Sequence, residues 1–295
     1  MREYNYRKIT VPSHLNSINI HNEFKFNLLF NSYVSENTPY NDSKKIVKNT
    51  LKKIYNDKCA YCESSLHNEY GEIEHYRPKK SSNLSKCNSK NAYYWLAFSW
   101  DNLIPCCKIC NVFKSNCFDI NNENNRVKYN NQSLYKLHTS LKAYHTLENP
   151  KLLHPEMDKF EDEITFYNKG QLVSKNEKVK YTLKICKLNR KKLKETREEI
   201  ITEHWSNLKK YLLALVLLKK EDEISEKGML HILSISFDKI ISNSNIKKPY
   251  SMVSLYIVNN FELFVNKIPR LSNENILLLL NLWNKYKEGK KLYEK

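Results

Sequence analysis

The chain has 295 residues and a strongly basic composition, with 49 lysines and arginines, 32 aspartates and glutamates, and a formal net charge of +17. This balance favours a polyanionic partner, because lysine and arginine gain by displacing counterions from phosphates. The opening residues carry no apolar stretch, and the longest aliphatic run, Leu212 to Leu218, is far below the roughly 20 residues that cross a bilayer, so we expect a cytoplasmic protein without a membrane segment.

Residues 1–56 are predicted to form an irregular arm followed by one helix. Apolar residues recur at helical spacing from Ile46 to Tyr55, and Asp42 or Ser43 would cap the start of the helix. We expect this helix to pack directly against the cysteine turn that follows it.

The segment 57–150 contains two Cys-x-x-Cys pairs, Cys59 with Cys62 and Cys107 with Cys110. Two such pairs supply the four thiolates of a tetrahedral structural zinc site, and a reducing compartment favours metal binding over disulfides. Cys106 adjoins Cys107 and is the alternative ligand, although it would be separated from Cys110 by three residues instead of two. The remaining cysteines are expected to be buried thiols: Cys87, Cys117 and Cys186. Of these, Cys87 and Cys117 are close enough to the two pairs for a role in metal binding to stay open.

A carboxylate lies beside a histidine between the two cysteine pairs, at Glu74 and His75. Within a zinc-held scaffold, this neighbourhood suggests a second, catalytic metal centre that acts on a phosphodiester. In a regular strand the two side chains point to opposite faces, so both serve one site only if the strand twists or ends here, and Pro78 favours such an end. Glu72 shares a face with Glu74 and is the rival ligand.

Residues 151–295 are predicted to form a connector with a hairpin and then a helical C-terminal region. An Asn-rich surface loop, 119–132, precedes this segment. The apolar runs 164–166 and 171–173 flank the turn Asn168-Lys-Gly170. Further along, apolar residues mark one helix face and three more periodic segments: Trp205, Leu208, Leu212 and Leu215, followed by 229–241, 251–267 and 274–287.

The order of these motifs resembles the HNH endonucleases, which share a ββα-metal fold. The segments that carry a narrower resemblance are Cys59-Ala-Tyr-Cys62-Glu63, Ile73 to Lys79, Trp100-Asp-Asn-Leu103 and Cys110-Asn111. They are similar to the PtuB-like HNH nucleases of Septu and retron-associated anti-phage systems, and the resemblance covers roughly residues 45–200, including 152–155 and 182–190. We therefore expect a mainly α fold with a small zinc-stapled ββα-metal nuclease core at 57–150.

The resemblance implies a role for each motif residue. His75 matches the general base, because an imidazole that titrates near neutrality can take a proton from the attacking water. Glu74 and Asn111 match the ligands of the catalytic metal, and their carboxylate and amide oxygens suit Mg²⁺ or Mn²⁺ better than zinc. Asn102 matches the structural residue that holds the loop orienting His75.

The surroundings of the motif suggest how nucleic acid and a partner protein would bind. Arg77, Lys79 and Lys114 flank motif residues and are the candidate phosphate contacts, whereas the aromatic cluster 93–95 is expected in the core. The resemblance also implies a PtuA-like ATPase partner of the SMC-like or AAA-like type, which delivers and restrains the nuclease. The alternative function is a non-catalytic, zinc-containing adaptor that binds nucleic acid and docks on the ATPase. DNA and RNA, including tRNA, are both open as substrates.

Overall fold

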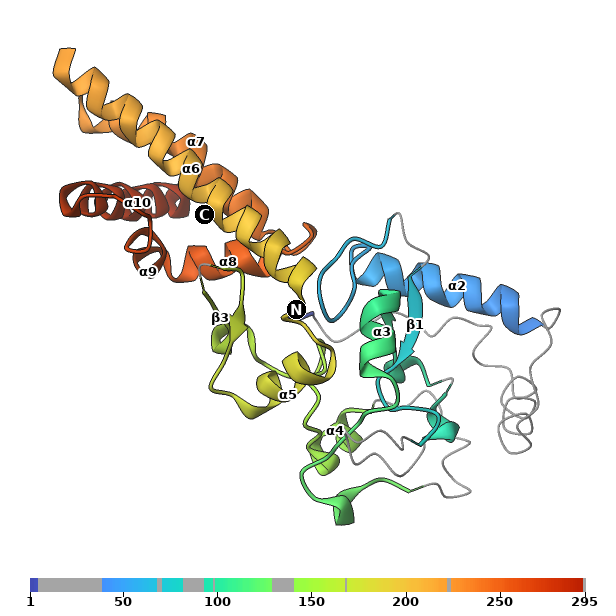
Figure 1. The fold of residues 1–295 in the computed structure, drawn as a ribbon. Coiled ribbons are helices and arrows are strands. Elements are labelled where there is room, and N and C mark those ends of the chain that lie inside the picture. Colours follow the sequence, from blue (N-terminus) through green and yellow to red (C-terminus); the bar gives the residue numbers. More distant parts are fainter. Residues whose placement is uncertain are drawn as a thin grey trace. The chain divides into compact units, whose positions relative to one another are not determined.

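The computed structural model describes residues 1–4, 39–67, 71–81, 93–97, 99–128, 141–167, 169–221 and 224–293 (Figure 1). The chain divides into two compact units, of which the first is Met1–Glu163 with Ser174–Asn189 and the second is Ile164–Val173 with Arg190–Lys295. These units do not coincide with a boundary near residue 150, because the predicted hairpin belongs with the C-terminal helices and the helix after it belongs with the first unit.

The first unit is organised around a small antiparallel sheet. Strand β1 (Glu72–His75) pairs with β2 (Leu103–Cys106), so that Glu74 lies opposite Ile104 and His75 opposite Leu103. Helix α3 (Lys108–Lys114) follows β2 after one residue, and it packs against β1 (Figure 1). The order strand, strand, helix therefore lies between Glu72 and Lys114, in the segment that contains Glu74, His75 and Asn111.

Helix α2 (Pro39–Ile54) precedes this sheet and contacts β2. It begins before the predicted caps at Asp42 and Ser43, at a proline, which suits a first helical position because its missing N–H would be unpaired there anyway. Buried side chains of α2 pack into a core with residues around β2, as the apolar spacing predicted: Val47, Leu51, Ala97, Trp100 and Leu103.

The other elements of the first unit are short. They are the 3-10 helices η2 (Tyr94–Leu96), η3 (Trp100–Asn102), η4 (Glu123–Asn125) and η6 (Glu161–Glu163), and the helices α4 (Lys142–Glu148) and α5 (Glu177–Ile185). The described part of the predicted Asn-rich loop contains η4, and an isolated bridge joins Ile120 to Pro150. The rest of that loop, like most of the predicted N-terminal arm, lies outside the described residues. Tyr93 and Trp95 are buried, so the predicted core position of the aromatic cluster is confirmed for them.

The second unit contains the helices α6 (Lys191–Glu221), α7 (Glu226–Ser244), α8 (Ser251–Asn259), α9 (Phe261–Val265) and α10 (Asn273–Tyr293). Helices α6 and α7 run side by side, and α10 packs against α7 (Figure 1). The three predicted apolar segments correspond to α7, to α8 with α9, and to α10. Leu208, Leu212 and Leu215 are all buried, which confirms the predicted apolar face of α6.

The predicted hairpin is present in the second unit as β3 (Thr165–Phe166) paired with β4 (Leu172–Val173). Gly170 in its turn has a φ of 65°, and a Cβ there would collide with the backbone carbonyl of Lys194 on α6. Glycine is therefore required by both conformation and space. Asn168 of the predicted turn lies outside the described residues.

The described residues form a mostly helical structure with two small sheets, in agreement with the predicted mainly α class. Among the helices of these residues, none is both long and apolar enough to span a membrane.

Candidate metal centre and active site

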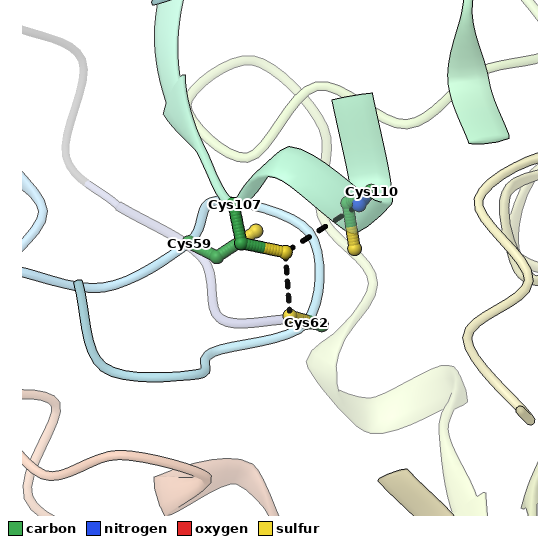
Figure 2. Close-up of side chains that lie close together, drawn as sticks. All are labelled: Cys59, Cys62, Cys107 and Cys110. Carbon is green, nitrogen blue, oxygen red and sulfur yellow. Dashed lines mark hydrogen bonds between the residues drawn. The ribbon is translucent and has the colours of Figure 1, made fainter. Parts of the chain in front are cut away.

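Four cysteine side chains converge at the start of α3 (Figure 2). The Sγ atoms of Cys59, Cys62, Cys107 and Cys110 all lie within 4.8 Å of one another, and all four residues are buried. A zinc–sulfur distance of about 2.3 Å places the sulfurs of a tetrahedral site about 3.8 Å apart, and the distance between the Sγ atoms of Cys62 and Cys107 is 3.8 Å. The predicted four-cysteine set is therefore brought together with a geometry that fits zinc.

Each cysteine pair is held by local backbone geometry. The first turn closes through hydrogen bonds from Cys59 N to Ser64 O and from Glu63 N to Cys59 O, and Glu63 adopts a left-handed φ of 63°. The amide of Ala60 donates to Pro105 O at 2.9 Å, which ties this turn to β2. In the second pair, Cys107 caps α3, and its Sγ accepts a hydrogen bond from the amide of Cys110 (Figure 2).

Cys106 is a fifth buried thiol beside the four sulfurs. Its Sγ lies 3.9 Å from that of Cys59 and donates to the carbonyl of Cys107. Burial raises the pKa of the Cys59 thiol well above its ordinary value, so a bound metal is the natural partner to hold it as a thiolate.

The cysteines away from the four-sulfur cluster differ from one another. Cys186 is buried as a thiol, as predicted. Cys117 is buried but disulfide-bonded, so the prediction of a simple thiol was wrong there. Cys87 lies outside the described residues.

His75 is the last residue of β1, and its half-buried imidazole faces the carbonyl of Ala97, with Nε2 at 3.0 Å from the oxygen. Because a carbonyl only accepts hydrogen bonds, Nε2 carries the proton and Nδ1 keeps its lone pair. Burial lowers the pKa of His75 to about 3, and the nearby charges of Lys79 and Lys114 act in the same direction. The imidazole is therefore neutral at physiological pH, and the expectation of titration near neutrality is not met.

Asn102, fully buried at the end of η3, ties together two segments that flank His75. Its Oδ1 accepts from the amide of Arg77 at 2.7 Å, while its Nδ2 donates to the carbonyls of Arg77 and Leu96 at 2.9 and 3.1 Å. Arg77 is two residues after His75. Leu96 is directly before Ala97, whose carbonyl binds the imidazole of His75. Loss of the Asn102 amide would release both segments.

Glu74 points to a different partner from that of His75. Glu74 is 4% exposed, and its carboxylate forms an ion pair with the ammonium of Lys114. Lys114 is 0% exposed, and its ammonium also donates to the His75 carbonyl at 2.5 Å. Burial raises the pKa of Glu74, and Lys114 opposes that shift. Glu74 thus contacts α3, whereas His75 contacts the segment after η2.

The oxygen donors predicted to hold a hard metal ion are those of Glu74 and Asn111. Asn111 is half-buried on α3, directly after the zinc-type ligand Cys110. Their chemistry suits Mg²⁺ or Mn²⁺, but the carboxylate of Glu74 already binds an ammonium, so a cation there would displace Lys114. Within the part of the chain that the structure describes, no other group of three His, Cys, Asp or Glu side chains converges besides the four cysteines.

Two of the three predicted phosphate contacts are inaccessible. Arg77 is 0% exposed, its Nε donates to Glu148 Oε2 at 2.8 Å, and its guanidinium lies over the rings of Tyr76 and Phe118. Lys114 is equally buried. Their predicted role on a surface is therefore corrected to one inside the core, and Lys79, which is half-buried, is the one that keeps access to solvent.

Glu148 was missed from the sequence, although it organises the same region. Its carboxylate accepts hydrogen bonds from Arg77, from the hydroxyl of Tyr93 and from the amide of Val127. It lies on α4, 71 residues after Arg77, and no local sequence pattern indicates that Glu148 and Arg77 pair. Its contacts fix the exit of β1 and the start of the segment that presents the Ala97 carbonyl.

Comparison with known proteins places the chain among Septu proteins. It is 32% identical to Septu protein PtuB of Bacillus mycoides (strain KBAB4) over 249 residues, which cover 77% of this chain and 79% of that protein. It is 39% identical over 70 residues, 23% of each chain, to Septu protein PtuB of Bacillus thuringiensis. Septu protein PtuA of Bacillus mycoides (strain KBAB4) is 26% identical over 190 residues, which are 63% of this chain and 25% of PtuA.

Other comparisons add no further relative. No family model matches the chain, and no solved structure matches it. The similarity to PtuB nevertheless extends over most of both proteins. The chain therefore belongs to the PtuB family of Septu anti-phage defence proteins.

Proposed function

We propose that this PtuB-family protein is a metal-dependent HNH endonuclease that hydrolyses phosphodiester bonds of nucleic acid as the effector of its defence system. The observation that carries the proposal is the order β1, β2, α3 with four converging sulfurs at the start of α3. This is the arrangement expected of a ββα-metal core. His75 and Asn111 lie on its first strand and its helix, and Asn102 directly precedes its second strand.

In the proposed reaction, His75 removes a proton from the attacking water, and the negative charge of the bound phosphate raises the pKa of the imidazole toward the range in which it accepts that proton. The lone pair of Nδ1 is available because Nε2–H is bound to the Ala97 carbonyl, and that carbonyl also stabilises the imidazolium after proton transfer. Asn102 keeps the imidazole in position through its hydrogen bonds on both sides. General-base catalysis of this kind contributes on the order of 10²–10⁴ in rate.

Two metals have separate roles in the proposal. Zinc on the four cysteines is structural, because a site with four protein ligands leaves no open position for a substrate. A Mg²⁺ or Mn²⁺ ion held by Glu74 and Asn111 would stabilise the negative charge on the phosphate and on the leaving oxygen. Glu74 reaches that role only when its carboxylate is released from Lys114.

The metal ligands can be tested by titrating Mg²⁺ and Mn²⁺ against cleavage of labelled DNA and RNA. Glu74→Ala should raise the metal concentration needed for half-maximal cleavage, whereas Glu72→Ala, the matched carboxylate on the same strand, should leave it unchanged. The reverse result would make Glu72 the ligand. Cleavage that persists in EDTA would contradict the requirement for a metal.

We further propose that the protein binds a PtuA-type ATPase and acts together with it. The supporting observation is that PtuA of Bacillus mycoides contains a segment similar to this chain. Modules that are linked in one protein are held at high effective concentration, and an interaction between them favours binding where they occur as separate chains. The docking surface would be on α6, where Leu213, Val216 and Leu217 are 59%, 37% and 55% exposed. Apolar residues gathered at this spacing on a helix are typical of an interaction site.

Size-exclusion chromatography with the PtuA protein of the same host tests this interaction. Leu213→Asp with Leu217→Asp should prevent co-elution. Leu277→Asp should not, although Leu277 on α10 is more exposed than either of them. Loss of binding with both variants, or with neither, would contradict docking on α6.

The non-catalytic adaptor is favoured by one observation, the ion pair between Glu74 and Lys114. A carboxylate that binds an internal ammonium permanently could not hold a catalytic metal. Cleavage that fails with wild-type protein at every metal concentration, together with intact PtuA binding, would support the adaptor over the nuclease.

A further inference from the structure

An open groove of about 480 Å³ lies in the first unit, beside helix α5. It is bordered by α5 on one wall and by the chain around the Ile120–Pro150 bridge on the other. The residues that line it are Asn121, Lys151, Glu177, Lys178, Lys180, Tyr181 and Lys184. None of them was singled out from the sequence as a functional residue.

The wall opposite α5 is held by specific hydrogen bonds. The amide of Lys151 donates to the Asp119 carbonyl at 2.9 Å, and the side-chain amide of Asn121 donates to the Asn149 carbonyl at 2.8 Å. The hydroxyl of Tyr181 accepts from the Asp119 amide at 3.3 Å, which joins this wall to α5. The groove is therefore a fixed feature of the fold.

The lining is basic beyond what its own carboxylates neutralise. Lys180 pairs with Glu177 at 2.7 Å, and Lys178 pairs with Asp158 at 3.0 Å. Lys151 and Lys184 are exposed, and among the described residues neither has a carboxylate within ion-pair distance. Two ammonium groups on facing walls thus leave the groove with unneutralised positive charge.

The same helix reaches the proposed active-site helix at its other end. The ammonium of Lys187, two residues past the end of α5, lies 4.5 Å from the centre of the Phe113 ring on α3. Phe113 is two residues from Asn111. A nucleic-acid strand bound along the lysines of α5 would therefore run toward α3, which carries Asn111 of the proposed nuclease site.

We propose that the α5 groove binds the sugar–phosphate backbone of nucleic acid. The proposal rests on the nuclease function proposed above and assigns its substrate-binding surface. Exposed lysines around an open groove suit a continuous chain of phosphates, and the half-buried ring of Tyr181 offers a face for a base. A free nucleotide would instead be expected in a mainly apolar pocket with a few converging polar groups.

The test measures binding of fluorescein-labelled 30-nucleotide DNA and RNA by anisotropy, at several salt concentrations and on a His75→Ala background that prevents cleavage. Lys151→Ala with Lys184→Ala removes the two unpaired ammonium groups. The matched control is Lys45→Ala with Lys53→Ala, because both are exposed lysines on α2 of the same unit. Circular dichroism and zinc content establish that each variant is folded.

The groove variant should bind roughly tenfold more weakly, with the slope of log affinity against log salt reduced by about 2, while the control changes affinity less than twofold. Equal losses in the two variants would overturn the proposal, because total charge would then explain binding. Unchanged oligonucleotide binding, with lost binding of a fluorescent ATP analogue, would assign the groove to a free nucleotide and also overturn it. Oligonucleotide binding that is strong but insensitive to both variants refutes the groove alone, whereas no binding to any nucleic acid refutes the nuclease proposal itself.

Discussion

Replacement of Lys114 by methionine would test whether an internal ammonium occupies the position of a metal cation. Methionine keeps most of the apolar stem but removes the charge that faces Glu74. Both residues are almost completely buried, with Lys114 at 0% and Glu74 at 4% exposure. Removal of one partner from a buried ion pair destabilises a protein by about 3–5 kcal/mol, because the other charge is left uncompensated, so we expect a loss of this size in the first unit.

A divalent cation should restore the stability of this variant. If Mg²⁺ or Mn²⁺ binds Glu74 once Lys114 is gone, it stabilises the folded state by about 2.7 kcal/mol at a concentration 100 times its dissociation constant. Wild-type protein should gain much less, because the ammonium must first be displaced. The matched control is Lys114→Met with Glu74→Gln, which has no carboxylate to compensate and should not respond to metal.

Hydrogen exchange of peptides covering β1 and α3 is the appropriate assay, because it reports on the first unit without interference from the helical unit. Exchange in Lys114→Met should accelerate in metal-free buffer and slow again on addition of Mn²⁺. Unchanged protection in metal-free buffer would refute the importance of the ion pair. An equal response of wild type and variant to Mn²⁺ would refute competition between the ammonium and a metal.

Three further predictions concern the metal centre, the motif loop and the helical unit. Cys59→Ser should lose the zinc, one equivalent per chain in the wild type, and unfold the motif region; a full equivalent of zinc in the variant would contradict the assignment. Asn102→Ala deletes three buried hydrogen bonds and should lower the unfolding free energy by about 3 kcal/mol, so a loss under 1 kcal/mol in urea titrations would show that the bonds are dispensable. His204, buried against Ser254, has its pKa lowered from 6.5 to about 4 by burial. It is neutral when folded, so the second unit should lose about 3 kcal/mol as the pH falls from 6.5 toward 4, and His204→Gln should flatten that dependence in pH-resolved thermal unfolding.

The features that could be predicted from the sequence depend on short-range patterns. The zinc-type ligands were found because Cys59 with Cys62 and Cys107 with Cys110 each occupy one tight turn, and spacing alone favoured Cys107 over Cys106. The hairpin around Gly170 and the apolar face of α6 follow from turn chemistry and helical period in the same way. Each of these patterns is contained within a few residues.

The features that were missed depend on partners far along the chain. Arg77 and Lys114 were predicted as surface contacts because basic residues beside a nuclease motif usually face the substrate. Their burial is made possible by Glu148 and by Glu74, which are 71 and 40 residues away. Tertiary pairing of this kind has no period and no motif. The groove lysines of α5 were also missed, because only the fold brings them opposite Lys151.

If His75 is the catalytic base of a nuclease, its removal slows the chemical step, and a single-turnover cleavage rate measures that step. The cleavage rates of the wild type, His75→Ala and His67→Ala would be measured in the presence of PtuA and Mg²⁺, at matched zinc content. His67 is an exposed histidine of the same unit and serves as the control. We predict that His75→Ala cleaves on the order of 10²–10⁴ times more slowly, while His67→Ala matches the wild type. A folded, zinc-loaded His75→Ala protein that cleaves at the wild-type rate would exclude His75 as the catalytic base.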